Sequence, residues 1–513
     1  MGLKQDEDFL RFLTMGAAGT AAVLDGLNRH HGHRMAELER YATANKIWAR
    51  KIKRLRLADL HCLDCGVRVE VRTKSQLAIR MSHSERPGRE WDAGLRDGDF
   101  VAFLAWQKED SVPAPFHHFF RVGEMREAAP LASLGARKAA SEGAERDITW
   151  PATVPRRSGT VIEIDPSSGT ARYQPYRGRL QTYRPKIPTA SIHCYVSPGQ
   201  SLVGGEEFIF GSVPLLTALK CAGGCWDFCG DLRAEDPVDR YAAVKAAGTN
   251  DRDADVEQLL LEIASNPEED QRIRLEAIAS LARFNPQSFV PELLDEILRS
   301  GQGDTKAKAL SLEGIFILSE LKSREAADAL VALASNRALE PEARSAAVWG
   351  LGTAGIDDAR RLLPFIADEN DDVALHALAA IGPADDSLRG ELGKMLLRGN
   401  DREAASAVAL LAEEGEPGIQ LLVDAARKED RAGLWAQAAL GRLSEEEVRS
   451  TGRLGPTLDA ALGPMWTDQR NWLRAQEPPS ALDLLRRQCV RHLGVQDHTF
   501  LAASRASPSP ERR

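Results

Sequence analysis

Apolar residues recur at helical spacing through much of the second half of the chain, from about residue 237 to residue 443. Ala-rich segments such as R-L-E-A-I-A-S-L-A-R-F and K-A-L-S-L-E-G-I-F-I-L recur there, separated by second segments such as F-V-P-E-L-L-D-E-I-L. Aligning the Ala-rich segments places one large apolar residue of each in register, at intervals of 35, 35, 30, 30 and 29 residues: Leu281, Phe316, Leu351, Ile381, Leu411 and Leu440. Two helices per unit at this interval predict an α-solenoid, because each unit buries its apolar face only against its neighbours.

The repeated pattern resembles HEAT repeats, and the resemblance extends over most of residues 237–443. It implies an all-α solenoid with an extended concave face that binds a protein partner. Residues 444–513 contain two further helical patterns, W-T-D-Q-R-N-W-L and A-L-D-L-L-R-R-Q-C-V-R-H-L, followed by S-P-S-P-E-R-R. We expect a helical cap on the array and then a disordered tail.

The first 125 residues have the mixed pattern of an α/β domain. Helical spacing runs from about Asp8 to Lys53, interrupted by N-R-H-H-G-H at Asn28–His33. The three histidines of this segment could bind a metal, but no Cys or acid falls at a familiar ligand spacing, so we predict a polar loop. Strand patterns follow it, and D-F-V-A-F-L-A-W is apolar enough for a central strand. The expected strands are 67–74, 77–81, 99–106 and 118–122.

Residues 126–157 are rich in Ala, Ser, Gly, Arg and Pro, so we expect a linker there. Residues 158–236 have a pattern of strands and turns instead. D-P-S-S-G has the form of a hairpin turn, and V-S-P-G-Q-S-L-V-G-G-E-E resembles the tight turn of a barrel-sandwich hybrid. A small β-domain is therefore expected before the solenoid. The predicted fold class is multidomain α+β.

Candidate chemistry is concentrated between residues 57 and 75. In a strand, the alternation of V-R-V-E-V-R-T-K places three valines on one face and Arg68, Glu70, Arg72 and Lys74 on the other. Asp59 precedes Glu70 by eleven residues, with C-L-D-C-G between them, so a hairpin would bring the two carboxylates together. Two carboxylates can hold Mg²⁺ against a phosphate, and a nearby cation can offset developing charge.

This arrangement resembles the PD-(D/E)xK phosphodiesterase superfamily, the restriction-endonuclease-like fold, in which an acid precedes a strand bearing (D/E)-x-K. The resemblance covers about 50 residues and implies a Mg²⁺-dependent endonuclease with Asp59, Glu70, Arg72 and Lys74 in catalytic roles. The chain departs from the pattern, because Ala58 stands in place of the Pro and Arg72 in place of the Lys. Arg is a poor general base, so either Lys74 takes that role, Arg72 acts only electrostatically, or the site is inactive. The alternative is a solvated hairpin face with a surface salt bridge.

Charge is unevenly distributed along the chain. The net charge is −9, yet residues 46–90 carry twelve Lys and Arg against five Asp and Glu. A local basic patch attracts a polyanion even when the whole protein is acidic. DNA or RNA is therefore a predicted partner, bound through Arg50, Lys51, Lys53 and Arg54. The alternative is that the basic segment pairs with acidic parts of the same chain.

Cys62 and Cys65, in C-x-x-C-G, have the form of a zinc knuckle. A closed structural site needs four ligands, and no second C-x-x-C is present. To complete the site, the tertiary fold would have to bring in His61, His83, Cys194 or the cysteines around Cys221. Two alternatives remain: Cys62 and Cys65 bind zinc, or they are free thiols on a turn.

Composition predicts a soluble, cytoplasmic protein without a membrane segment, because 27% of the residues are charged and no apolar run has transmembrane length. Seven cysteines without an export signal favour reduced thiols, and the Ala- and Arg-rich composition is typical of a prokaryotic source. Two functions remain: a metal-dependent, nucleic-acid-binding nuclease-like protein with a HEAT-repeat scaffold, or a non-catalytic HEAT-repeat adaptor whose N-terminal domain is a binding module.

Overall fold

The computed structural model describes residues 6–38, 48, 50, 55–140, 143–165, 168–224, 226–250, 253–353, 359–381 and 384–473. They belong to two compact units, one drawn from residues 1–46 and 53–284 and the other from residues 47–52 and 285–501. Within the described part of the chain, no helix is both long and apolar enough to cross a membrane.

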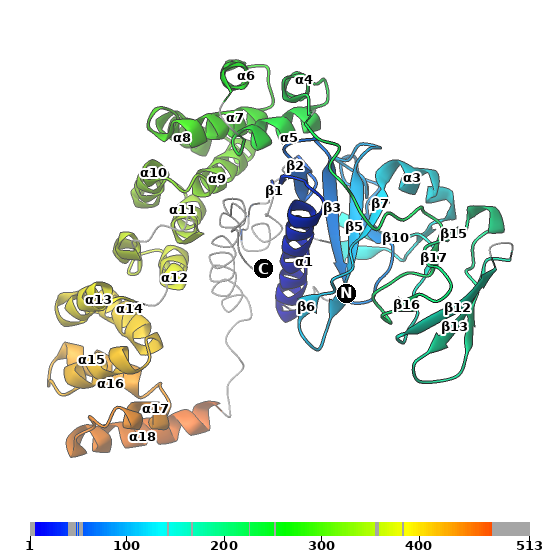
Figure 1. Ribbon diagram of the computed structural model, residues 1–513. Helices are drawn as coiled ribbons and strands as arrows, with labels where there is room; N and C mark the ends of the chain where they lie inside the picture. The colour runs from blue at the N-terminus through cyan, green and yellow to red at the C-terminus, as the bar shows by residue number, and fades with distance from the viewer. Residues whose placement is uncertain are drawn as a thin grey trace, which may run out of the picture. The chain divides into compact units, whose positions relative to one another are not determined.

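The first unit is built on a six-stranded mixed sheet with one long helix against it, α1 (Asp6–His30) (Figure 1). The strand order is β1-β2-β3-β5-β6, and β7 also pairs with β5. β3 and β5 are parallel and the other pairs are antiparallel. The strand bounds are β1 (Met35–Glu37), β2 (Leu60–Cys62), β3 (Arg68–Lys74), β5 (Phe100–Gln107), β6 (Val112–Pro113) and β7 (His118–Arg121).

The two faces of this sheet bury different cores. On one face, Val69 and Val71 of β3 pack with Val23 and Leu27 of α1. On the other face, the core includes Phe103 of β5 together with residues from later segments of the chain. The alternation predicted along β3 is therefore confirmed, since its valines face α1 and its charged residues project from the opposite side.

The sequence-based interpretation was wrong in two places within this unit. Met35–Glu37 is a strand that pairs with β2 rather than a continuation of the helix; Gly32 has a φ of +70°, where a helix cannot continue. Residues 126–157 are not a linker. Part of that segment forms β10 (Gly143–Thr149), which pairs with β4 (Arg80–His83), and Trp150 is 1% exposed in the core.

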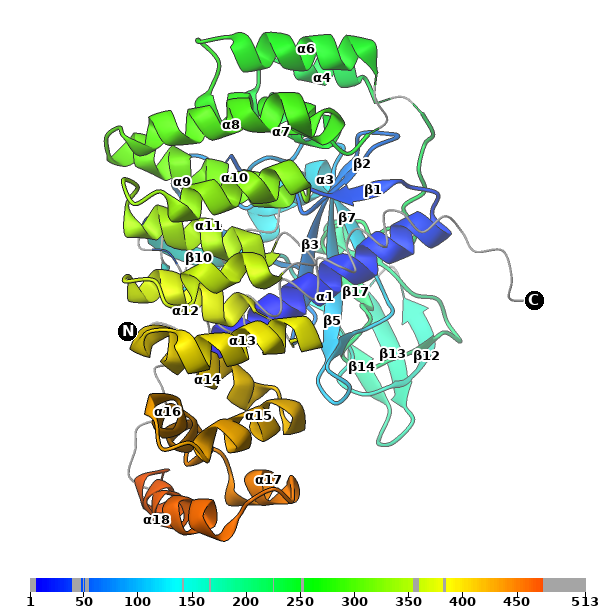
Figure 2. The same ribbon diagram turned by 90° about the vertical axis from the view of Figure 1, so that its left-hand side faces the viewer.

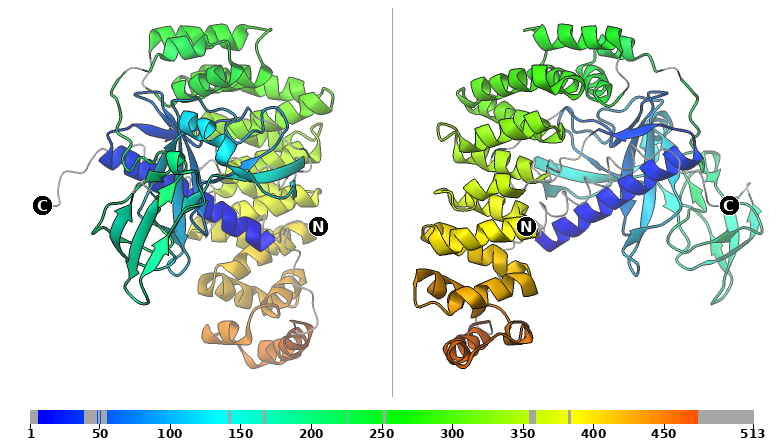
Figure 3. Two further views of the ribbon diagram at one scale, coloured as in Figure 1. Left: turned by 90° about the vertical axis from the view of Figure 1, so that its right-hand side faces the viewer. Right: turned by 60° about the vertical axis from the view of Figure 1, so that its left-hand side comes forward.

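Downstream of these residues, β12 (Gly159–Asp165) and β13 (Thr170–Pro175) form the predicted hairpin, which is coloured teal in the left-hand view of Figure 3. The hairpin belongs to a four-stranded antiparallel sheet ordered β14-β13-β12-β16. Its other strands are β14 (Gln181–Tyr183) and β16 (Ser201–Leu202). The short strands β11 (Ala152–Thr153), β15 (His193–Cys194) and β17 (Phe210–Gly211) form a separate three-stranded sheet. A small β-region is thus present where the sequence predicted one.

Helices follow one another along the rest of the chain, and within each unit they pack against one another (Figure 2). The helices up to residue 284 belong to the first unit, and those from residue 285 on belong to the second. The helices are α4 (Phe228–Leu232), α5 (Pro237–Ala247), α6 (Ala254–Ser265), α7 (Gln271–Phe284), α8 (Pro286–Gly301), α9 (Thr305–Glu320), α10 (Arg324–Ser335), α11 (Pro341–Thr353), η3 (Ala359–Phe365), α12 (Asp371–Ala380), α13 (Asp386–Arg398), α14 (Asp401–Glu413), α15 (Glu416–Ala426), α16 (Arg431–Leu440), α17 (Glu445–Ser450) and α18 (Pro456–Leu473).

The register predicted for the repeats is confirmed. All six aligned positions lie in α7, α9, α11, α14 and α16 or at the end of α12, and each is buried. Ion pairs one repeat apart reinforce the stacking: Lys308 binds Glu340 at 2.6 Å, and Arg431 binds Asp401 at 3.2 Å. A solenoid-like array of helices is thus present in this part of the chain. The predicted disordered tail lies outside the described residues.

Candidate functional sites

The acidic site predicted from the sequence is assembled at the start of β2 and along β3. The Asp59 carboxylate accepts a hydrogen bond of 2.7 Å from the backbone amide of Val71, which fixes it beside β3. The Arg72 guanidinium contacts the Glu70 carboxylate and lies 3.8 Å from Asp59. Both carboxylates therefore converge on one guanidinium, as the predicted hairpin required.

Ionisation at this site is strongly perturbed. Burial, reinforced by the negative charge of Glu70, raises the pKa of Asp59 to about 8. Burial, together with the charges of Arg72 and Arg80, lowers the pKa of Lys74 to about 7. Glu70 is also approached by Arg56 at 3.5 Å. At neutral pH the site thus contains a protonated Asp59, the Glu70 side chain, the permanent cation of Arg72 between them and a Lys74 amine that is partly uncharged.

These features permit two kinds of chemistry. A divalent cation binding to Asp59 and Glu70 would have to displace the guanidinium that now occupies the space between them. Without such a cation, Arg72 pairs with Glu70 and lies beside Asp59, whose raised pKa keeps its carboxyl group protonated at neutral pH. Arg68, on the same strand face, is not part of this site; the residue is 1% exposed, and its guanidinium binds Asp239 of α5 at 2.6 Å.

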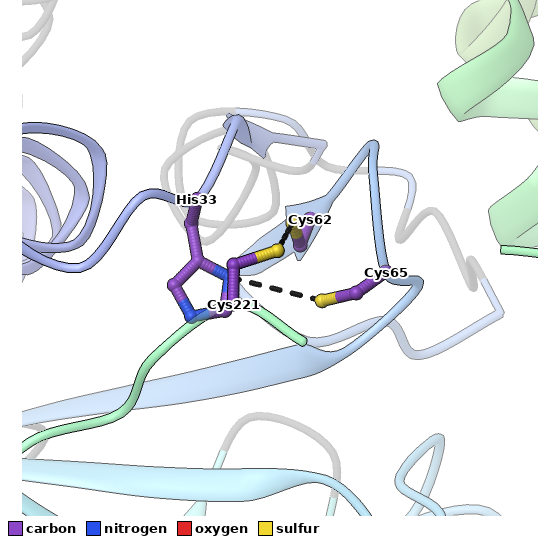
Figure 4. Close-up of side chains that lie close together, drawn as sticks. All are labelled: His33, Cys62, Cys65 and Cys221. Atoms are coloured by element: carbon purple, nitrogen blue, oxygen red, sulfur yellow. Dashed lines mark hydrogen bonds between the residues drawn. The ribbon is translucent and has the colours of Figure 1, made fainter. Parts of the chain in front are cut away.

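A second cluster lies at the other end of β2. The side chains of His33, Cys62, Cys65 and Cys221 offer one histidine nitrogen and three sulfur atoms, all within 4.8 Å of one another (Figure 4). A hydrogen bond from Cys65 holds the pKa of the Cys62 thiol well below its usual range despite burial. Of the described residues considered for completing the zinc knuckle, Cys221 lies in this cluster.

The other three suggested ligands have different partners. His61 stacks on Trp226 with ring centroids 4.2 Å apart, His83 accepts a hydrogen bond from the Trp91 amide at 3.3 Å, and Cys194 contacts the Val196 carbonyl. His33 was assigned to a polar loop rather than to a metal site, because a histidine 29 residues before Cys62 matches no ligand spacing. The position of His33 between α1 and β1 indicates a metal ligand only when it is known that β1 pairs with β2, the strand that ends at Cys62.

A third site lies within the second unit, where Trp48 is only 4% exposed. Its indole stacks on the His376 ring of α12, and it packs against Phe316 of α9 at 5.7 Å and Trp349 of α11 at 6.3 Å between ring centroids. We call these three solenoid residues the aromatic seat. No pattern in the sequence singled out Trp48.

Beside the aromatic seat, two acids hold Arg50. Its guanidinium binds Glu340 at 2.9 Å and Glu342 at 3.4 Å, and its backbone amide donates a hydrogen bond of 2.9 Å to Glu342. Arg50, predicted as a phosphate contact, is therefore engaged with carboxylates. The companion predictions at Lys51, Lys53 and Arg54 lie outside the described residues.

No protein-family model and no curated protein sequence matches the chain. Among solved structures, it is similar to Kap121p, with 12% identity and a TM-score of 0.29 over 57% of this chain and 37% of that chain. It is also similar to human deoxyhypusine hydroxylase, with 16% identity and a TM-score of 0.21 over 47% and 97% of the two chains. The complex of CpcE and CpcF of phycocyanin lyase from Nostoc sp. PCC7120 matches with 18% identity and a TM-score of 0.20 over 48% and 97%.

Scores of this size are too low to support an argument about function. The chain spans well under half the length of the Kap121p chains, and the comparisons lend no support to the resemblance to PD-(D/E)xK nucleases.

Proposed function

We propose that the protein is an interaction scaffold whose HEAT-type solenoid binds a polypeptide partner through an aromatic side chain followed two positions later by a basic one. The observation that carries this proposal is the way in which the second unit holds Trp48 and Arg50. A nearly fully buried indole and a guanidinium on two acids are the kinds of contact that dominate binding energy at protein interfaces.

The chemistry of the site defines the class of partner. The aromatic seat offers ring faces and edges to a flat apolar side chain, which gains both buried area and favourable ring–ring geometry. Glu340 and Glu342 offer carboxylates to a guanidinium, for which bidentate or paired contacts are favoured. An acidic peptide would be repelled, so we expect a segment with the order aromatic, any residue, arginine.

The segment around Trp48 then acts as an internal competitor. Because it belongs to the same chain, its effective concentration at the seat is high, and a partner must displace it to bind. The solenoid would therefore bind most tightly when Trp48 and Arg50 are withdrawn or removed.

A peptide-binding measurement on the full-length protein tests this. A fluorescein-labelled peptide with the sequence of residues 44–54, A-N-K-I-W-A-R-K-I-K-R, should bind the Trp48→Ala/Arg50→Ala variant in a polarisation assay and bind wild type at least tenfold more weakly. The same peptide with Ala in place of Trp should not bind. Adding Glu340→Gln and Glu342→Gln to the variant should weaken binding by about tenfold or more, since each lost charged hydrogen bond costs about 1.5–3 kcal/mol.

The matched control is Glu391→Gln on α13, an acid paired with Lys394 away from the seat; it should leave peptide binding unchanged. Failure of the peptide to bind a folded double variant would refute the proposal. So would equal binding of the peptides with and without the tryptophan.

A second candidate function is metal-dependent phosphodiester cleavage at Asp59 and Glu70, favoured by the convergence of both carboxylates on Arg72. In this proposal Mg²⁺ takes the place of the guanidinium between the acids, and Lys74, whose pKa is lowered to about 7, faces the scissile phosphate. Nucleic acid would be the substrate, with DNA and RNA both to be tried.

A sensitive fluorescence assay with DNA and RNA in Mg²⁺ or Mn²⁺ decides it. Wild type should cleave nucleic acid, whereas Asp59→Ala and Glu70→Ala should be inactive, because each substitution removes a metal ligand from a site that has few ligands. The variants Lys74→Ala and Arg72→Ala then show whether Lys74 acts as the general base or Arg72 acts only through its charge. Glu163→Ala, an exposed acid on β12, is the control. Absence of cleavage by wild type, or undiminished cleavage by Glu70→Ala, would leave only the scaffold function.

A further inference from the structure

We propose that His33, Cys62, Cys65 and Cys221 bind one structural zinc ion. This inference is independent of both proposed functions. It concerns what holds the first unit together, rather than what either site binds.

The four side chains come from three separate stretches of chain. His33 follows α1, Cys62 ends β2, Cys65 lies on the turn that leads to β3, and Cys221 lies on the segment before α4. Backbone contacts hold these stretches in place: the Cys221 amide donates to the His31 carbonyl at 2.9 Å, and the Leu63 amide donates to the Arg34 carbonyl at 2.9 Å.

The turn that bears Cys62 and Cys65 has the backbone of a metal knuckle. The amide of Gly66 donates to the Cys62 carbonyl at 2.9 Å, and the Cys62 amide donates to the Val67 carbonyl at 2.9 Å. Gly66 has a φ of +73°, a conformation that glycine adopts without strain. The glycine after the second cysteine is thus required by the turn, which brings both sulfur atoms to one side.

The orientation of the histidine is independent evidence for a metal ligand. The Nε2 atom of His33 lies 3.0 Å from the Leu219 carbonyl oxygen, which can only accept a hydrogen bond. Nε2 therefore carries the hydrogen, and in the neutral ring Nδ1 carries the lone pair. Nδ1 points into the cluster, 3.8 Å from the Cys65 sulfur (Figure 4). A ligating histidine whose other nitrogen donates to a backbone carbonyl is the usual arrangement around zinc.

The distances fit a tetrahedron around zinc. With Zn–S bonds of about 2.3 Å and tetrahedral angles, two sulfur ligands lie about 3.8 Å apart. The sulfur atoms of Cys62 and Cys221 are 4.0 Å apart. A disulfide would require about 2.05 Å, so small side-chain movements suffice for zinc whereas a disulfide needs a much larger one.

Three thiolates and one imidazole leave no coordination position open, which is the signature of a structural rather than a catalytic zinc site. The ion would join the end of α1, the hairpin between β2 and β3, and the segment leading into the helical array. Asp59 immediately precedes β2, so the same ion would also stabilise the strand that positions the acidic site.

Metal analysis of the full-length protein tests the proposal. Protein purified anaerobically with reductant and added zinc should contain one zinc per chain by mass spectrometry. Cys65→Ser and Cys221→Ser should lose it, while His33→Cys should retain it because a fourth thiolate replaces the imidazole. Cys194→Ser and Cys229→Ser, which change cysteines outside the cluster, should retain it. Cobalt in place of zinc should show thiolate charge-transfer absorption and the intense visible bands of tetrahedral geometry.

If the cysteine variants do not fold, wild type still provides the test: a mercurial reagent that modifies thiols should release one zinc per chain, detected with a chromogenic chelator. The proposal is overturned if wild type holds no zinc after reconstitution, or if folded Cys221→Ser keeps a full equivalent. A disulfide between Cys62 and Cys221 in the reduced, zinc-treated protein would overturn it as well.

Discussion

The Trp48 indole stacks on the His376 imidazole, with ring centroids 5.0 Å apart and planes inclined by 20°. A residue near the end of the segment that the sequence predicted to be helical thus forms part of the interior of the solenoid unit. Because the rings of Phe316 and Trp349 enclose the other sides of the indole, Trp48 completes a cluster that the repeats alone would leave open.

Removing that indole should destabilise the second unit. Trp48→Ala leaves a large cavity among aromatic rings, and we expect a loss of about 3–5 kcal/mol in the free energy of unfolding, measured by urea denaturation. The matched control is Trp435→Ala on α16, where the tryptophan is only half-buried; its loss should be clearly smaller. Equal effects of the two substitutions would show that Trp48 contributes no more than a surface aromatic.

The solenoid could be predicted from the sequence because its determinants are local and repeated. Leu281 and Phe316 fall in register since each repeat buries the same helical face. The acidic site was also predictable, because Asp59 and Glu70 are joined by a short hairpin. His33, Cys221 and Trp48 reach their partners only through contacts between distant segments, and a single sequence carries no spacing that reports such contacts.

Asp59 should make the stability of the protein fall with rising pH. Its pKa is raised to about 8 in the folded protein, from about 3.9 in an unfolded chain. Between these values the folded state binds more protons than the unfolded state, so this group costs stability progressively as pH rises from about 4 to about 8. Asp59→Asn removes the titration but keeps an oxygen for the Val71 amide.

The difference in melting temperature, Asp59→Asn minus wild type, should therefore increase across that pH range and level off above it. Differential scanning fluorimetry at several pH values measures this difference, in which the titrations shared by both proteins cancel. A constant difference, or one that decreases with pH, would mean that Asp59 is ionised in the folded protein at neutral pH.

Lys74 should be unusually nucleophilic near neutral pH. Burial and the neighbouring charges of Arg72 and Arg80 lower its pKa to about 7, so a large fraction of its amine is uncharged at pH 7.5. Limiting amounts of an amine-reactive acylating reagent should modify Lys74 earlier than the bulk of the lysines, as followed by peptide mass spectrometry from pH 6 to pH 10. Arg72→Gln removes the first charged neighbour and should move the onset of labelling to higher pH. Labelling of Lys74 only above pH 9 in wild type would contradict the expectation.

The last prediction concerns the buried ion pair that joins α5 to α7. Lys245 and Glu276 have side chains 3% and 0% exposed, their charged atoms lie 3.0 Å apart, and the Tyr241 hydroxyl donates to the same carboxylate oxygen at 3.3 Å. Glu276→Ala leaves an ammonium buried without its principal counter-charge, and we expect a loss of about 3–5 kcal/mol in unfolding free energy. The double variant Lys245→Met/Glu276→Leu should lose far less, because apolar groups of similar size avoid the cost of burying charge.

The control is Glu391→Ala, which breaks the exposed pair with Lys394 and should cost only about 0–1 kcal/mol. Chemical denaturation of the four proteins measures these values, and a double variant as unstable as Glu276→Ala would show that shape and hydrogen bonding, rather than the unpaired charge, dominate at this helix contact.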